Sequence, residues 1–343
     1  MSNKERLNDF GSELGRLLEF QNISINEYAD RIGTTPKNLI DIIDGKVSLS
    51  FNMICNIAFI SEIPVDYICN VEESFKIDNK IDEFTKENNI TVKEYLKRFN
   101  YKELSSLYNL KYRDERNDYS ILEDILKYLR IVNPRKIYEN NNHIFYKSKN
   151  DKPELLALWL ERCYRIVMNQ EIGVYNKNNI DKLVEFIRIE ANENKFNRDR
   201  LIKEFNKNGV YLAIESDLSG AKIRGAFRVL NDKPAIYITT KHKRYADVYF
   251  ALLHEIAHLK SDFNRAKNGA LISLEEEKNS EDYEIRADET ALNYMVDSKE
   301  YEKILKNGVP SKVNSFLAYR LARDGVIKYS SKLYQDSNKL IDN

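Results

Sequence analysis

Two histidines four residues apart lie in the C-terminal third of the chain, in the segment His254-Glu255-Ile256-Ala257-His258. On a helix this spacing places both imidazoles on one face, where they can bind the same metal ion. Glu255 lies about 100° around the helix from His254, so its carboxylate can take a proton from an activated water molecule without being a ligand. The pattern predicts a zinc-dependent peptidase with Glu255 as catalytic base. The alternative, two unrelated surface histidines, is weaker because the chain has only four histidines.

A third ligand is expected among the acidic residues downstream of this motif. Glu284 and Asp288 are one helical turn apart and share a face with Glu281, whereas Asp282 and Glu289 point elsewhere. We predict that Glu284 binds the metal and that Asp288 accepts a hydrogen bond from a ligand histidine. The reverse assignment, and ordinary charge on a helix surface, are the alternatives.

Three strands and one helix are predicted to position these residues. Segments 210–214, 221–230 and 235–240 have the composition of strands, and segment 246–260 has the apolar periodicity of a helix. Residues 208–343 are therefore expected to form a small α+β domain whose sheet packs on the helix with the histidines. A substrate peptide is expected to pair in extended form with an exposed edge of strand 235–240.

Residues 71–207 have apolar side chains at helical spacing almost throughout and no motif that carries chemistry. We interpret them as a helical connecting region. The fold class predicted for the whole chain is mostly α with one small α+β domain.

Residues 1–70 are predicted to form a bundle of short helices that contains a helix-turn-helix. Ser24, followed by Glu27 three residues later, marks the start of one helix, and Gly33 marks its end. Thr35 followed by Pro36 marks the start of the next helix. Two helices joined by a short glycine-containing turn have the layout of this DNA-binding motif.

The second of these helices would present its first residues to double-stranded DNA. The side chains of Thr34, Thr35 and Asn38 can meet base edges or phosphates, and Lys37 can neutralise a phosphate. Residues 1–70 carry six basic and ten acidic residues, a net charge of −4, which is unfavourable for DNA affinity. A homodimer would double the contacts. The alternative is a helical module for protein contacts.

Composition excludes several classes of protein. The 54 basic and 54 acidic residues cancel, so net charge indicates no particular partner. The first twenty residues are too charged for a signal peptide, and no apolar run reaches the roughly 20 residues that span a bilayer. The three cysteines are few and widely spaced, which indicates free thiols. We therefore expect a cytoplasmic protein without a membrane partner.

The chain resembles the ImmA/IrrE-like metallopeptidases, in the long form, often labelled HigA-like, that carries an XRE-type helix-turn-helix. The resemblance covers roughly residues 8 to 334 and includes the E-x-x-x-D layout of gluzincin-type peptidases at Glu284 and Asp288. Many relatives have another acidic residue and an Asn where this chain has Arg286 and Asp288, and the proline-containing segment that usually follows is absent. Further matching segments are 45–46, 157–160, 218–228 and 233–238.

The resemblance implies one zinc ion and cleavage of a protein such as a repressor. We therefore expect a transcriptional regulator with a zinc endopeptidase domain. One alternative is a non-catalytic DNA-binding antitoxin with a structural or sensory metal site; another is a free peptidase whose N-terminal helices dock a protein. Glu255 favours catalysis, because a structural site needs only its ligands. The residue that stabilises the transition state stays open among Arg228, Tyr237, His242 and Tyr249.

Overall fold

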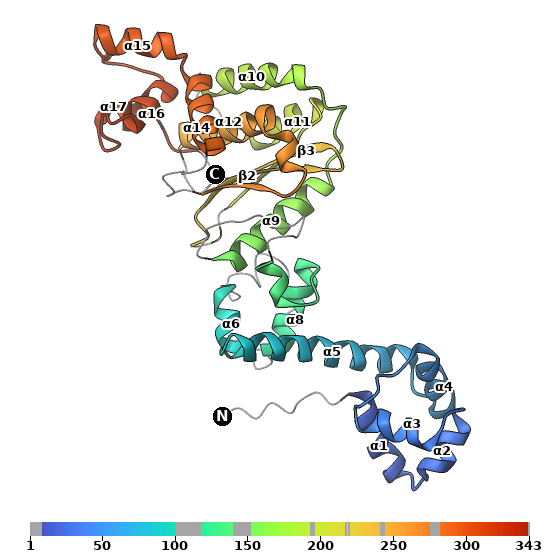
Figure 1. Cartoon of the computed structure of the whole chain (residues 1–343). Coiled ribbons are helices and arrows are strands. Elements are labelled where there is room, and N and C mark those ends of the chain that lie inside the picture. Colours follow the sequence, from blue (N-terminus) through green and yellow to red (C-terminus); the bar gives the residue numbers. More distant parts are fainter. Residues whose placement is uncertain are drawn as a thin grey trace. The chain divides into compact units, whose positions relative to one another are not determined.

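In the residues that it describes, the computed structural model of the chain is mostly helical and has one four-stranded mixed sheet; Figure 1 shows the arrangement of its elements. It divides into two compact units, Met1–Lys136 and Ile137–Asn343. This architecture confirms the predicted fold class at the level of a mostly α protein with a small sheet, and the predicted middle region 71–207 contributes to both units. The residues described are 9–100, 118–139, 152–192, 196–216, 218, 220–240, 244–274 and 282–341.

The described part of the N-terminal unit is helical. Its first five helices share one apolar core, to which Leu14, Ile32 and Leu39 contribute buried side chains. The helices are α1 (Phe10–Phe20), α2 (Ile25–Arg31), α3 (Pro36–Ile43), α4 (Phe51–Ser61), α5 (Val65–Glu87), α6 (Val92–Arg98) and α8 (Asp118–Leu129), and the 3-10 helix η1 (Pro134–Ile137) follows them.

Local sequence explains where α2 and α3 begin and end. The hydroxyl of Ser24 accepts the backbone N–H of Glu27, and the hydroxyl of Thr35 accepts that of Asn38. Between the two helices Gly33 adopts a φ of 71°, in the left-handed region that glycine tolerates best. Two helices joined by a short turn are therefore present at the predicted residues, while their role in DNA binding stays a prediction.

Helix α5 is much longer than its sequence pattern predicted. The pattern of short helices in residues 1–70 predicts a short helix at 65–68, but α5 runs from Val65 to Glu87. The segment contains no glycine or proline, so nothing interrupts the backbone hydrogen bonds before Asn88 and the left-handed Asn89. Residue 70, the predicted end of the first module, lies inside this helix.

The C-terminal unit surrounds the sheet with helices. The 3-10 helix is η2 (Lys177–Asn179), and the strands are β1 (Tyr211–Glu215), β2 (Ile223–Leu230), β3 (Lys233–Thr239) and β4 (Leu271–Leu274). The α-helices are α9 (Pro153–Met168), α10 (Ile180–Asn192), α11 (Arg198–Lys207), α12 (Tyr245–Ser261), α13 (Phe263–Ala266), α14 (Asp282–Met295), α15 (Ser298–Asn307), α16 (Ser315–Arg323) and α17 (Lys332–Ser337).

The strand order is β1-β3-β2-β4, so β3 is internal. It pairs in parallel with β1 and antiparallel with β2. The expectation that a substrate peptide pairs with strand 235–240 is therefore wrong, because both edges of that strand are already hydrogen-bonded. The apolar residues on both faces of β3 are typical of an internal strand. Strand β4 was not predicted; it pairs antiparallel with β2.

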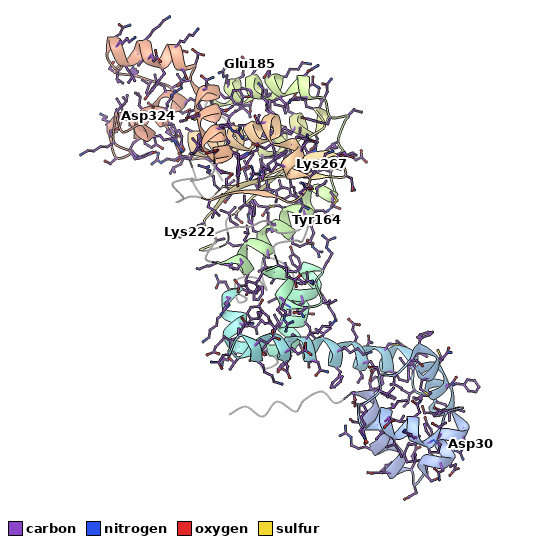
Figure 2. All side chains as sticks on the ribbon, in the orientation of Figure 1. Asp30, Tyr164, Glu185, Lys222, Lys267 and Asp324 are labelled. Atoms are coloured by element: carbon purple, nitrogen blue, oxygen red, sulfur yellow. The ribbon has the colours of Figure 1, made fainter. Side chains whose placement is uncertain are left out.

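The two faces of the sheet have different helical partners. On one face Tyr237 of β3 packs edge-on against Trp159 of α9, and Arg228 of β2 lies over the ring of Tyr164, which is labelled in Figure 2. The other face supplies Phe227 and Ile236 to the core around α12. Helix α12 is therefore held between the sheet and the outer helices, and fourteen of its 17 residues are buried.

Residues near the C-terminus of the chain cap the N-terminus of α12. The side-chain oxygen of Asn338 accepts the N–H of Ala246 at 2.9 Å, and the carbonyl of Lys339 accepts the N–H of Tyr245 at 3.1 Å. These bonds satisfy N–H groups that the start of a helix leaves without partners.

Candidate metal centre

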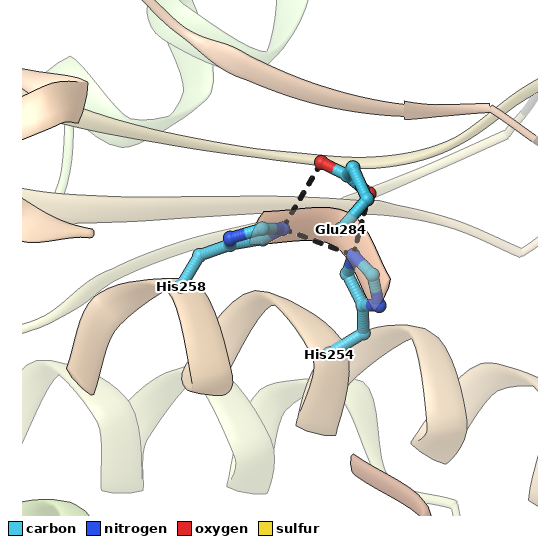
Figure 3. Close-up of side chains that lie close together, drawn as sticks. All are labelled: His254, His258 and Glu284. Atoms are coloured by element: carbon cyan, nitrogen blue, oxygen red, sulfur yellow. Dashed lines mark hydrogen bonds and ion pairs between the residues drawn. The ribbon is translucent and has the colours of Figure 1, made fainter. Parts of the chain in front are cut away.

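Three buried side chains converge between α12 and α14 (Figure 3). The Nε2 atoms of His254 and His258 are 3.0 Å apart. Glu284 places Oε2 at 3.1 Å from Nε2 of His254 and Oε1 at 3.2 Å from Nε2 of His258. The small, buried Ala287 and Ala291 of α14 allow the close approach to α12. The structure thus brings together the three predicted metal ligands.

The geometry of these atoms fits a metal ion such as zinc. A tetrahedral zinc ion bound at about 2.0–2.2 Å separates its ligand atoms by about 3.3–3.6 Å, close to the observed distances. Two imidazole nitrogens and one carboxylate are a donor set that zinc commonly takes. The lone pairs of all three groups face one another, and only a proton or a cation between them can bind these lone pairs. The group can therefore hold a metal ion, and its identity as zinc stays a prediction.

Each histidine also contacts a second carboxylate through its other nitrogen. Nδ1 of His254 lies 2.7 Å from Oδ1 of Asp288, as predicted, and Nδ1 of His258 lies 2.9 Å from Oδ2 of Asp262. Because an ionised carboxylate only accepts hydrogen bonds, both Nδ1 atoms donate and both Nε2 atoms are left for a ligand. Sequence analysis did not identify Asp262, although it follows His258 by one helical turn.

The charges of the group stabilise one another in the absence of a metal. Burial disfavours the charged form of His258, but its hydrogen bonds to Asp262 and Glu284 outweigh this effect and raise its pKa to about 9. Burial also disfavours the charged form of Glu284 and so raises its pKa, but the two histidines outweigh this effect and lower the pKa of Glu284 to about 2. A cation that displaces the proton of His258 therefore meets a carboxylate that is already ionised.

Glu255 packs against β2 and β4, close enough to His254, His258 and Glu284 for their charges to act on its carboxyl group. The hydroxyl of Ser273 in β4 donates to Oε1 of Glu255 at 2.8 Å. A Cβ atom at Gly225 of β2 would lie 2.5 Å from the same oxygen, so only glycine leaves room for the carboxylate. Oε2 is buried and has no hydrogen-bond partner among the described residues. Burial raises the pKa of Glu255 above its ordinary value.

Two arginines that sequence analysis missed hold Asp288. Arg224 of β2 donates from Nη2 to Oδ1 of Asp288 at 3.2 Å, and Arg323 of α16 donates to Oδ2. Both guanidinium groups lie over the ring of Phe250, at 5.1 and 4.5 Å from its centroid. Burial favours the neutral form of Asp288, but His254 and the two arginines outweigh it and hold its pKa well below the usual range.

Three of the four residues considered for transition-state stabilisation are described, and their contacts are with aromatic side chains rather than with the metal group. Arg228 and Tyr237 are on the sheet face that packs on α9, away from α12. Tyr249 packs against the rings of Phe196 and Phe316. His242 lies outside the described residues, as does Glu281.

The residues predicted to meet DNA lie together at the start of α3. The side chains of Thr34 and Asn38 are hydrogen-bonded to each other at 2.9 Å, and Thr35 caps the helix. Thr35 and Lys37 are exposed, whereas Thr34 and Asn38 are half-buried. Lys37 is thus the exposed cation of this group.

No helix in the described ranges is long and apolar enough to cross a membrane.

No curated protein matches the chain significantly. Residues 227–318, from β2 to α16, match the model of the peptidase U49 family. This region is less than half of the chain, but it contains His254, His258 and Glu284. The match, together with the metal-binding geometry, supports a metallopeptidase of that family in the C-terminal unit.

Proposed function

We propose that the C-terminal unit is a zinc-dependent endopeptidase that cleaves a protein partner, and that Glu255 is its general base. One observation supports catalysis over a structural metal site. Glu255 lies beside the three-ligand group, yet its Oε1 is held by Ser273 and its Oε2 has no partner among the described residues. A site that only binds metal needs no such carboxylate.

The residues can divide the reaction as follows. When bound, a zinc ion supplies Lewis acidity, which polarises a peptide carbonyl and makes water a better nucleophile at neutral pH. Oε2 of Glu255 accepts a proton from the attacking water and later donates it to the amide nitrogen as the C–N bond breaks. Burial raises the pKa of Glu255 above its ordinary value, which makes its carboxylate a stronger base.

Strand β4 replaces β3 as the place where a substrate would bind. Among the described residues β4 pairs only with β2, at one end of the sheet. Ser273 of this strand contacts Glu255. An extended peptide paired with β4 would therefore pass the catalytic base with its backbone already ordered.

For the N-terminal unit we propose binding of double-stranded DNA, which would make the whole chain a transcriptional regulator with its own peptidase. The α2–α3 layout and the exposed Lys37 support this proposal. A second candidate is docking of a protein substrate, because Phe51 and Phe59 lie two helical turns apart on α4 and are 68% and 85% exposed. A DNA gel-shift assay at two salt concentrations separates the two, since phosphate contacts weaken as salt rises.

Incubation with candidate repressors tests the peptidase. We expect discrete fragments from the wild-type protein, none in the presence of a chelator, and recovery when zinc is added. Glu255→Gln should retain the metal and yield no fragments, whereas Glu289→Gln, the same change at an exposed position on α14, should cleave normally. Loss of metal from Glu255→Gln, or cleavage by it, would refute the assignment of the base.

A further inference from the structure

Strand β2 carries one residue more than β4 beside the metal group. Ile223 pairs with Leu274 and Gly225 pairs with Ser273, so two steps along β2 correspond to one step along β4. Arg224 is the extra residue. Such a β-bulge interrupts the alternation of side chains between the two faces and re-aims the residue at the bulge.

The bulge changes the face on which Arg224 lies. Regular alternation would place Arg224 on the α9 face, together with Ala226 and Arg228. Arg228 does lie there, 5.7 Å from the ring centroid of Tyr164. The guanidinium group of Arg224 instead lies on the α12 face, where Nη2 is 3.2 Å from Oδ1 of Asp288 and 3.4 Å from Nδ1 of His254.

The two arginines that contact Asp288 do not have equivalent positions. Arg224 meets Oδ1, the same oxygen that accepts the proton of His254 Nδ1. Arg323 meets the other oxygen, Oδ2. Orientation of the oxygen that faces His254 thus depends most directly on Arg224.

We propose that Arg224 is a positioning residue of the metal centre and that the β-bulge places it there. It acts through Asp288: by holding Oδ1 in place, it keeps the proton of His254 on Nδ1 and leaves Nε2 available to the metal ion. The proposal rests on the proposed metal site, and it assigns Arg224 no contact with substrate. It also gives the bulge a function, because without the extra residue the arginine would lie on the far face of the sheet.

Metal affinity of the full-length protein tests this role without relying on activity. Zinc is removed, and its affinity is then measured by competition with a chromogenic chelator. We expect Arg224→Ala to bind zinc about 10–100-fold more weakly, and Arg224→Lys to fall between it and the wild type because an ammonium group lacks the planar fork of arginine. Arg323→Ala should lose less affinity than Arg224→Ala. The matched control Arg228→Ala, on the other face of the same strand, should bind as the wild type does.

A double-mutant cycle separates positioning through Asp288 from a general structural effect. If Arg224 acts through this carboxylate, Arg224→Ala should cost little further affinity in an Asp288→Asn background. Wild-type affinity in Arg224→Ala, or the same fold loss in both backgrounds, overturns the inference and leaves the peptidase proposal intact. Absence of zinc binding by the wild type overturns both. If thermal unfolding shows that Arg224→Ala is not folded, the zinc affinities of Arg224→Lys and Arg323→Lys are compared instead. A lower affinity in Arg224→Lys supports the proposal, and equal affinities contradict it.

Discussion

The hydroxyl of Ser273 lies 2.8 Å from Oε1 of Glu255, so the proposed base on α12 is held by a residue of strand β4. Helix α12 fixes the backbone of Glu255, and the hydrogen bond from Ser273 of β4 fixes the orientation of its carboxylate. The strand proposed to receive substrate is therefore the strand that orients the proposed base.

Ser273→Ala removes this hydrogen bond and leaves a buried carboxylate with less restraint. We expect kcat to fall about 10–100-fold, since hydrogen bonds to charged groups contribute about 1.5–3 kcal/mol, while zinc content stays the same. Steady-state kinetics and metal analysis on the same preparation check this. Ser261→Ala, at an exposed position at the end of α12, is the control; an unchanged kcat in Ser273→Ala would show that the contact does not position the base.

Removal of the charge from Glu284 and from Asp288 should have different effects on zinc content and activity. Glu284→Gln should lose most of the zinc and all activity, because its carboxylate lies within 3.1–3.2 Å of both ligand nitrogens. Asp288→Asn should cost about 10–100-fold in metal affinity or rate, because it acts through His254. Zinc stoichiometry of both purified variants decides. Full loading of Glu284→Gln beside a metal-free Asp288→Asn would reverse the assignment.

Metal affinity should rise with pH up to about 9. Without metal the pKa of His258 is about 9, so below this pH its imidazole is protonated and binding must release that proton. Affinity should then increase about tenfold per pH unit from pH 7 to 9 and level off above it. Asp262→Asn removes a partner that favours the protonated form, so the plateau should begin at a lower pH. Affinities at pH 7, 8 and 9 check this, and a flat profile would contradict it.

Lys37→Ala combined with Asn38→Ala should weaken DNA binding about tenfold or more and leave zinc content unchanged. The reason is that both residues lie in the first turn of α3, where such a module would meet the groove. Gel-shift titrations measure the effect, with Lys86→Ala at an exposed position of α5 as the control. Equal DNA affinity in the double variant and the wild type would favour the protein-docking role.

The sequence by itself determined the features that depend on neighbouring residues. The spacing of His254 and His258 placed both imidazoles on one face of α12, and the spacing of Glu284 and Asp288 did the same on α14. The caps at Ser24 and Thr35 marked the starts of α2 and α3. Asp262 could have been found by similar reasoning, because it follows His258 by four residues, immediately after the end of α12.

Only the tertiary structure decided which segments lie side by side. Strand β3 is internal because β1 and β2 both pair with it, and these pairings join separate segments of the chain. The roles of Gly225 and Ser273 depend on the register between β2 and β4, and that of Arg224 on one extra residue in that register. Arg323 reaches Asp288 only because α16 packs near α14. Periodicity predicts which face of an element is apolar, whereas contacts between distant elements are set by how those faces pack together.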